Sequence, residues 1–273
     1  MTSNAKDFKY VITSGWWCGP DSEINNKRTK YGSDSIRSLE FFDQWHAAID
    51  SFTNPVKILI VDSASHHIPT PHKDPRVELV SLDENAGHST SHLGKYAGVS
   101  RAHLCGMVYA LSCNVDYWVY IEQDALIHGK GIVEHAISSM TGDILFGDGT
   151  GTPQPMQQSF MIMKTSAIPR FIERFTAIRS RDAEISPEMK FWMASHGWAT
   201  YLPECIFQDT AADRLPFGIV GRVRNLLISR GRNFGLLPFG YGRTRPINFT
   251  DQFYYFQHGT VSELESHGAN TPA

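Results

Sequence analysis

The first 120 residues alternate between short apolar runs and stretches of helical periodicity, and this alternation limits the possible folds more than any other feature. Apolar residues recur every three or four positions from Ile36 to Phe52 and from Leu93 to Cys113, as on one face of a helix. Apolar runs that predict buried strands lie at 10–12, 56–61, 77–82 and 117–121. We therefore expect an α/β domain with a largely parallel sheet, whose ligands bind at the carboxyl ends of the strands.

The second half is less regular and ends in a strongly basic segment. Its pattern predicts strands at 143–146 and 160–163 and helices at 167–178 and 187–196. Residues 214–250 contain six glycines and no Asp or Glu. They also contain seven arginines, namely Arg214, Arg222, Arg224, Arg230, Arg232, Arg243 and Arg245. Such a one-sided charge distribution predicts contact with an anion, and the glycines predict mobility.

Composition excludes several classes of protein. The 25 Lys and Arg against 28 Asp and Glu give a formal charge of −3, so the whole molecule is not an electrostatic binder of nucleic acid. The four cysteines form no CxxC pair, which predicts reduced thiols. The first residues lack the apolar stretch of a signal peptide, and no run approaches the ~18 apolar residues of a membrane span. We therefore expect a cytoplasmic protein.

Glu122, Gln123 and Asp124 follow the apolar strand 117–121 directly. Side chains two apart on a strand point the same way, so the two carboxylates are expected to face one ligand. Paired carboxylates suit Mg²⁺ or Mn²⁺, which proteins often hold with one or two acids plus substrate phosphates. Ordinary acids at a solvated strand end are the open alternative.

The order of several motifs resembles nucleotide-sugar glycosyltransferases of the A-type fold (GT-A), especially glycosyltransferase family 2. In that family a strand ends in an Asn-x-Gly loop, a helix follows, and an apolar strand delivers a DxD-type metal motif. The matching positions are Asn85–Gly87 for the loop, Glu122–Asp124 for the metal motif, Val61–Ser63 for a strand end at the nucleotide base, His196–Trp198 with Tyr201–Pro203 for a later element, and Gln257–Gly259 for a late histidine. The resemblance covers roughly 8–210 and the strand at 253–260.

This resemblance implies a single Rossmann-like domain over 1–273, with a mostly parallel sheet flanked by helices. It implies a nucleotide-binding half at 8–130, an acceptor-binding half at 131–210, a mobile basic segment at 211–250 and a closing strand at 251–260. The implied reaction moves a sugar from a nucleoside diphosphate, UDP favoured over GDP, to a saccharide or lipid-linked hydroxyl with inversion. The implied cofactor is Mn²⁺ or Mg²⁺, held by Asp124, Glu122 and His258.

The sequence departs from the family in several places. The metal motif begins with Glu122 instead of Asp, and the family's second Asn-x-Gly is replaced near His92, Leu93 and Gly94. No Gln-x-x-Arg-Trp box is present, which disfavours processive polymer synthesis. The family's Glu-Asp pair, which carries the catalytic base, aligns with Ile185 and Ser186. The candidate bases are therefore, in order, Glu188, Glu184 and Asp148, of which Glu188 could equally be a helix cap and Asp148 a turn residue.

Polar residues at the other strand ends are candidates for binding the nucleotide. Thr13, Ser14, Asp62 and Ser63 are expected there, with Asn85 and Gln123 from the loops, and Trp16 and Trp17 as stacking partners. A purely structural turn role for Asp62 stays open. The arginine segment is expected to close over the diphosphate, to bind a lipid phosphate, or to contact an anionic membrane peripherally.

Two other functions remain open from the sequence. A sugar nucleotidyltransferase would share this fold, but its glycine-rich basic loop is not seen at 13–17. A non-catalytic module that binds a nucleotide sugar would keep the pocket and lack a working base. We expect no nucleic-acid partner for any of the three.

Overall fold

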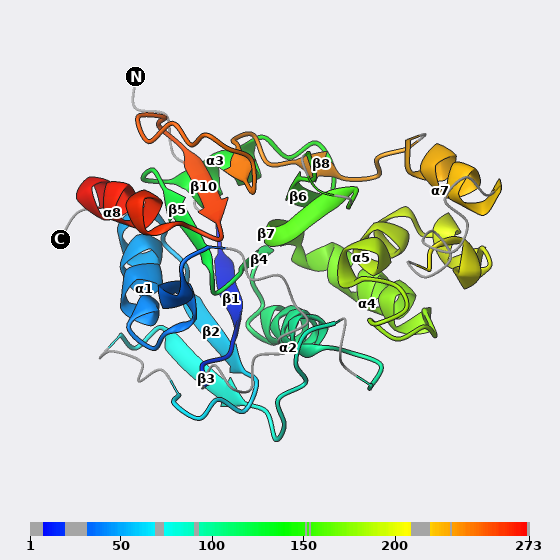
Figure 1. Ribbon diagram of the computed structural model, residues 1–273, viewed down its shortest axis with the longest axis horizontal. Helices are drawn as coiled ribbons and strands as arrows, with labels where there is room; N and C mark the ends of the chain where they lie inside the picture. The colour runs from blue at the N-terminus through cyan, green and yellow to red at the C-terminus, as the bar shows by residue number, and fades with distance from the viewer. Residues whose placement is uncertain are drawn as a thin grey trace.

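A mostly parallel sheet forms the centre of the molecule (Figure 1). The computed structural model describes residues 8–19, 32–68, 74–89, 93–150, 152, 154–208, 219–229 and 231–271. Seven strands lie in the order β3-β2-β1-β4-β7-β6-β8. They are β1 (Tyr10–Trp16), β2 (Lys57–Asp62), β3 (Val77–Ser81), β4 (Tyr117–Ile121), β6 (Ile144–Asp148), β7 (Met156–Lys164) and β8 (Gly235–Leu236). Only β7 runs against its neighbours β4 and β6, so the predicted α/β class is confirmed.

Helices cover both faces of this sheet, because alternate strand residues point to opposite sides. On β1, Tyr10 and Ile12 join one apolar core while Val11 joins the other. The first core packs against α1 (Phe41–Phe52) and α3 (Ile132–Ser138). The second packs against α2 (Gly98–Ser112), α4 (Ile168–Ala177) and α5 (Pro187–His196). The sheet is therefore buried on both faces, and its functional residues are left to the strand ends.

A second, three-stranded sheet brings a strand from the last quarter of the chain to the turn after β4. It consists of β5 (Ala125–His128), β10 (Tyr254–Gln257) and β9 (Tyr241–Gly242), with β10 in the middle. β10 pairs antiparallel with β5 and places Gln257 opposite Ala125. The closing strand predicted within 251–260 is thus β10, and it carries its last residue to the Glu122–Asp124 turn.

Shorter elements and the C-terminal helix complete the described chain. They are the 3₁₀ turns η2 (Asp34–Arg37), η3 (Thr165–Ala167), η4 (Trp198–Tyr201) and η5 (Glu204–Ile206), and the helices α7 (Ile219–Ser229) and α8 (Val261–Asn270). In these described residues we find no helix that is long and apolar enough to span a membrane. The division of the chain into donor and acceptor halves stays a prediction.

Three predictions of local structure are corrected. The helix expected from Ile36 is split, because Ser38 is extended and α1 begins only at Phe41. β7 starts at Met156, before the apolar run at 160–163, with polar residues in its first half. Glu122 and Asp124 lie in a turn after β4, closed by a hydrogen bond from Ala125 N to Glu122 O (3.0 Å), and not on the strand itself.

Candidate functional site

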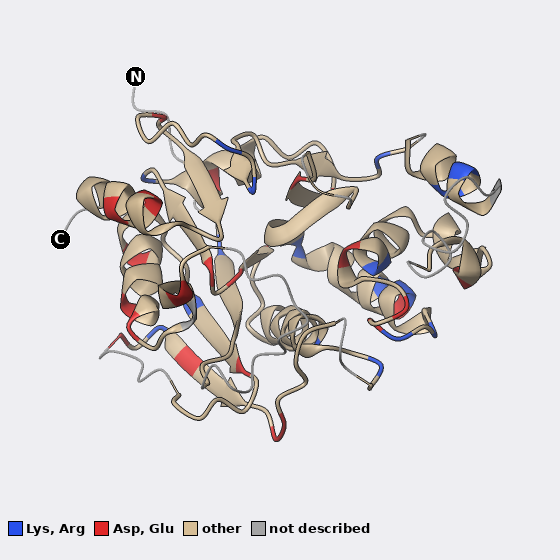
Figure 2. Cartoon of the chain, in the orientation of Figure 1, with Lys and Arg blue, Asp and Glu red and all other residues tan. Residues whose placement is uncertain are grey.

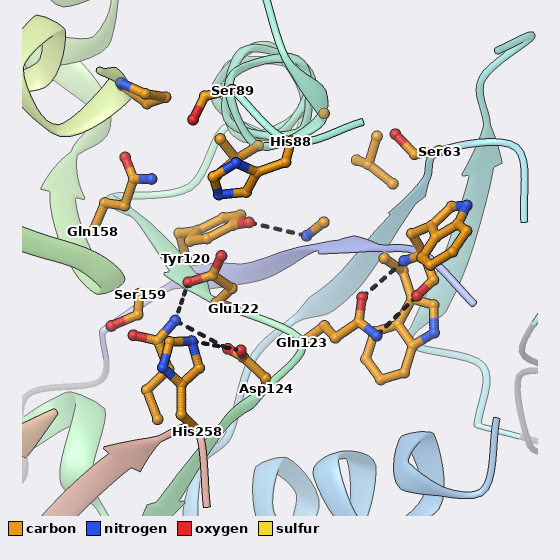
Figure 3. Close-up of a pocket in the computed structure, with 18 of the residues that line it drawn as sticks. Ser63, His88, Ser89, Tyr120, Glu122, Gln123, Asp124, Gln158, Ser159 and His258 are labelled. Carbon is orange, nitrogen blue, oxygen red and sulfur yellow. Dashed lines mark hydrogen bonds and ion pairs between the residues drawn. The ribbon is translucent and has the colours of Figure 1, made fainter. Parts of the chain in front are cut away.

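A pocket opens at the carboxyl ends of β1, β2 and β4 (Figure 3). We call it the strand-end pocket. Its wall is completed by the loop after β3, the first turns of α2 and α5, the start of β7 and the end of β10. Among the described residues it is lined by Gly15, Trp16, Trp17, Val61, Ser63, Asn85, Gly87, His88, Ser89, Gly98, Val99, Tyr120, Glu122, Gln123, Asp124, Gln157, Gln158, Ser159, Pro187, Glu188, Arg243, Gln257 and His258, with Ile36 at one side. This is the edge at which a parallel α/β sheet binds its ligands.

The two acids of the β4–β5 turn converge on one amide group. Gln257 Nε2 donates to Glu122 Oε2 at 2.7 Å and to Asp124 Oδ1 at 3.1 Å. His258 Nε2 lies 3.1 Å from the other oxygen of Asp124. The three predicted metal ligands therefore lie together, although 134 positions separate Asp124 from His258 in the sequence. Glu122 and Asp124 thus face one amide group from the turn, and their role as metal ligands stays a prediction.

Asp124 is held in its ionised form. Burial alone would raise the pKa of its carboxyl, but the hydrogen bond and charge of His258, followed by Gln257 and Arg243, outweigh burial and keep that pKa below its usual value. A carboxylate that stays ionised at neutral pH is what a divalent cation requires.

The backbone of His258 is fixed in an uncommon conformation. Its φ is +59°, in the left-handed region that residues with a side chain rarely adopt. Gly32 lies against it so closely that a Cβ there would come within 2.7 Å of the His258 carbonyl group, and Ser33 N donates to Gly259 O at 2.8 Å. Strained conformations of this kind concentrate at functional sites, where the surrounding structure holds them.

The donor set fits a hard divalent cation. Two carboxylates within reach of one point, with an imidazole beside them, suit Mn²⁺ or Mg²⁺ completed by substrate phosphates. Among the described residues, no group of three or more His, Cys, Asp or Glu side chains is placed so that it could hold a metal ion. Glu122 and Asp124 would therefore hold the metal, with His258 on the far oxygen of Asp124.

The wall formed by β1 is fixed by side chains of β4 and of the Glu122–Asp124 turn, which we call the acidic turn. Gln123 Oε1 accepts from Trp17 N at 2.8 Å, and Gln123 Nε2 donates to Trp17 O at 3.0 Å, so one amide clamps the Trp17 backbone from both sides. Gly15 N donates to the hydroxyl of Tyr120 at 3.2 Å. The ring of His103 stacks under Tyr120 with centroids 3.7 Å apart, and burial lowers the pKa of His103 to about 4, so it is neutral. The predicted residue Gln123 thus shapes this wall.

A bulge turns polar residues of β7 into the pocket. Phe146 pairs with Met161 while Gly147 pairs with Gln157, which leaves three β7 residues between these pairs without a partner on β6. Bulges commonly re-aim side chains beside active sites. Gln158 is 6% exposed, and its Oε1 accepts no hydrogen bond from any described residue. An uncharged amide whose oxygen lacks a hydrogen-bond donor, at a pocket wall, is suited to the hydroxyl groups of a ligand.

The three candidate bases occupy different surroundings. Glu188 lies in the first turn of α5 and lines the pocket. Glu184 is bound by Arg181, which donates from its backbone at 2.8 Å and from Nη2 at 2.9 Å and lowers the pKa of that carboxyl. Asp148 accepts from Thr150 N and Oγ1 in a local turn. Of the three, only Glu188 is among the described residues that line the pocket.

The residues predicted to bind the nucleotide fall into two groups, those that line the pocket and those buried beside it. Ser63, Asn85 and Gln123 line the pocket, and Asn85 Oδ1 accepts from Gly87 N at 2.8 Å. Three others are buried beside it, with partners of their own. Thr13 Oγ1 accepts from Trp118 Nε1 at 2.8 Å, Asp62 accepts from Ser65 and Ser81, and the Ser14 hydroxyl is directed to a main-chain carbonyl. As the structure stands, Thr13, Ser14 and Asp62 are not among the lining residues.

The predicted arginine segment is spread over several surfaces. Arg243 lines the pocket, Arg245 is bound to β10 and α8, and Arg222 and Arg224 lie on α7. Arg214 and Arg230 lie outside the described residues.

Sequence reasoning missed the lining residues Tyr120, Gln157, Gln158 and Ser159 as candidates. Tyr120 belongs to an apolar strand pattern and gave no signal. Gln157–Ser159 interrupt the apolar residues around them, and three polar residues in succession at the start of a buried strand are a signal that could have been found.

No known family model and no curated protein sequence matches this chain. Among solved structures, the mannosyltransferase PcManGT from Pyrobaculum calidifontis, in complex with GDP-Man and Mn²⁺, shows 13% identity and a TM-score of 0.41 over 69% of this chain. The overlap covers 53% of that protein, so this chain spans about half of its length.

Two further solved structures show similarly distant likeness. HddC from Yersinia pseudotuberculosis has 10% identity and a TM-score of 0.35 over 59% of this chain and 79% of its own. A putative glucose-1-phosphate thymidylyltransferase from Bacillus anthracis, in complex with a sucrose, has 8% identity and a TM-score of 0.41 over 97% of this chain and 96% of its own. At these values the likeness assigns no function, which has to be argued from the pocket.

Proposed function

We propose that this protein is a metal-dependent glycosyltransferase of the A-type fold, resembling glycosyltransferase family 2. It would transfer one sugar from a nucleoside diphosphate, UDP favoured over GDP, to a saccharide or lipid-linked hydroxyl, with inversion and without processive synthesis. The observation that carries the proposal is the convergence of Glu122, Asp124 and His258 in the strand-end pocket, which Glu188 also lines.

The charge of the pocket supports the need for a cation. Its described lining residues include three carboxylates, Glu122, Asp124 and Glu188, against a single arginine, Arg243. A diphosphate would enter a site of net negative charge, which Coulomb repulsion disfavours. A bound Mn²⁺ or Mg²⁺ would supply the missing positive charge and stabilise the leaving diphosphate.

The remaining lining residues can be assigned to the steps of inversion. Glu188 would take the proton from the acceptor hydroxyl while the acceptor oxygen forms its bond to the anomeric carbon. The bond from that carbon to the diphosphate oxygen breaks, and the nucleoside diphosphate leaves on the side opposite the attack. Gln158 and Ser159 would hold the sugar hydroxyls, and the wall formed by Trp17, Gln123 and Ser63 would hold the nucleoside.

A peripheral membrane contact through the 214–245 region would suit a lipid-linked acceptor. α7 lies at the opposite end of the molecule from the acidic helices α1 and α8 (Figure 2). Leu226 on α7 is 47% exposed beside the basic Arg222, and Tyr201 of η4 is 90% exposed. Exposed apolar side chains beside a basic one, as on α7, fit an anionic bilayer. We expect co-sedimentation with phosphatidylglycerol vesicles that Leu226→Glu weakens, and equal binding by both proteins would contradict this.

A nucleotide screen tests the proposed function. The wild-type chain and Asp124→Asn are titrated calorimetrically with UDP, GDP, CDP and dTDP, each with and without Mn²⁺ or Mg²⁺. We expect one nucleotide to bind wild type at least ~10-fold more tightly with metal than without, because two carboxylates and the phosphates share the ion. Asp124→Asn should lose that gain while its circular dichroism spectrum stays unchanged.

The same screen separates the alternatives. Metal-dependent binding without hydrolysis or transfer on any acceptor would favour a non-catalytic module that binds a nucleotide sugar. Release of pyrophosphate from a nucleoside triphosphate and a sugar phosphate would favour a nucleotidyltransferase. If wild type bound none of the four nucleotides, the proposal would be wrong.

A further inference from the structure

One cation of fixed charge faces the strand-end pocket. Among the described lining residues, Arg243 is the only Lys or Arg. It follows β9, whose Gly242 pairs in parallel with Phe256 of β10, so the backbone next to it is anchored in the second sheet. A guanidinium in a pocket that also holds three carboxylates has two explanations, either as a counter-charge for those acids or as the binding partner of an anionic ligand.

The contacts of Arg243 favour the ligand. Its Nε donates to Gln257 Oε1 at 3.1 Å, and no other hydrogen bond joins its side chain to a described residue. The Gln257 amide is oriented by hydrogen bonds at both of its ends. Its oxygen accepts from Arg243, and its nitrogen donates to Glu122 and Asp124. The amide thus separates the arginine from the acids, and the two terminal nitrogens of the guanidinium remain available for an anion.

The neighbouring Arg245 has a structural role, and its hydrogen bonds differ from those of Arg243. It donates to three main-chain carbonyls, of Gly242, Thr244 and Gln257, and its Nε lies 2.5 Å from Glu263 Oε1. These contacts tie the loop after β9 to β10 and α8. Two arginines that are two residues apart therefore differ in kind: Arg245 is bound within the protein, and Arg243 faces the pocket.

We propose that Arg243 binds the diphosphate of the donor, with Gln257 as the positioning residue that aims it. This inference rests on the proposed function and identifies which residue of the basic segment acts at that site. A planar guanidinium with two parallel N–H groups matches two oxygens of a phosphate group, which a lysine ammonium cannot do. The chain then contacts the diphosphate from β10 and the loop after β9, as well as from the acidic turn.

Calorimetry on the full chain tests this with matched ligands. Wild type, Arg243→Gln, Arg243→Lys and the surface control Arg170→Gln, on an exposed position of α4, are titrated with UDP and with uridine in the presence of Mn²⁺, or with the diphosphate and nucleoside of the base that wild type prefers. We expect Arg243→Gln to weaken diphosphate binding about 10- to 100-fold, as expected for loss of hydrogen bonds to a charged group. Nucleoside binding should not change, Arg243→Lys should restore part of the loss, and Arg170→Gln should match wild type.

The outcomes separate this inference from the proposed function. If wild type binds a nucleoside diphosphate and Arg243→Gln binds it equally well, the inference is wrong while the proposed function stands. Tighter Mn²⁺ binding in Arg243→Gln, with unchanged diphosphate affinity, would show that Arg243 only balances the acids. If wild type binds no nucleoside diphosphate, both are overturned together. Thermal midpoints of the variants, measured alongside, check that each one folds.

Discussion

The ends of β2 and β4, the strands on either side of β1, carry acids, and the protein uses them differently. Asp62 ends β2 with no exposed surface, and its carboxylate accepts from Ser65 and Ser81, which are 3 and 19 residues away. Asp124 follows β4 and accepts from Gln257, which is 133 residues away on β10. Both lie at the carboxyl edge of the same parallel sheet, but only Asp124 lines the strand-end pocket.

The difference lies in where the partners come from. Ser65 in the loop after β2 and Ser81 on the adjacent strand β3 fill the oxygens of Asp62, and the bonds from Ser65 fold that loop as a turn. The partners of Asp124 come from a second sheet whose edge forms the pocket wall, so its carboxylate is held in place and still faces the cavity. A polar residue at a strand end is thus a candidate for binding a ligand only when the adjoining loop and strand do not already fill its hydrogen bonds.

The largest effect expected from this contrast concerns the two glutamates near the start of α5. Glu188→Gln should lower the rate of sugar transfer by about 10²- to 10⁴-fold, the usual contribution of a general base. The amide keeps the size of the side chain, so metal-dependent nucleotide binding should stay within about threefold of wild type. Steady-state kinetics with the donor found in the nucleotide screen measures the first, and calorimetry measures the second.

Glu184→Gln is the matched control, because this carboxylate is already occupied by Arg181 at 2.8 and 2.9 Å. We expect its transfer rate to equal that of wild type. A rate lost in Glu184→Gln and kept in Glu188→Gln would reverse the assignment of the base and contradict the contrast between acids that line the pocket and acids that do not.

The fold was largely predictable from local patterns, and the site only in part. The helix predicted at 187–196 is α5. The apolar runs around Ile12 and Val119 locate strands that the structure confirms, because burial on both faces of a sheet leaves a strong sequence signal. The acidic turn was found for the same reason, since it directly follows such a run. Gln158 and Arg243 were not singled out, because a bulge in β7 and the pairing of β9 with β10 bring them to the pocket, and neither is encoded locally.

The smaller effect concerns Asp62, where the sequence left a ligand role and a turn role open. Asp62→Ala removes the acceptor for Ser65 N (3.1 Å) and for the Ser65 and Ser81 hydroxyls, so buried donors lose their partner. We expect the free energy of unfolding, measured by urea denaturation, to fall by about 1–3 kcal/mol. Ser81→Ala removes only one of these bonds, at 2.8 Å, and should cost less.

Nucleotide affinity of the folded fraction should be unchanged, because the loop after β2 reaches the pocket through Ser63 and not through Asp62. Unchanged stability with lost nucleotide binding would instead make Asp62 a ligand contact, and the two strand ends would then be alike.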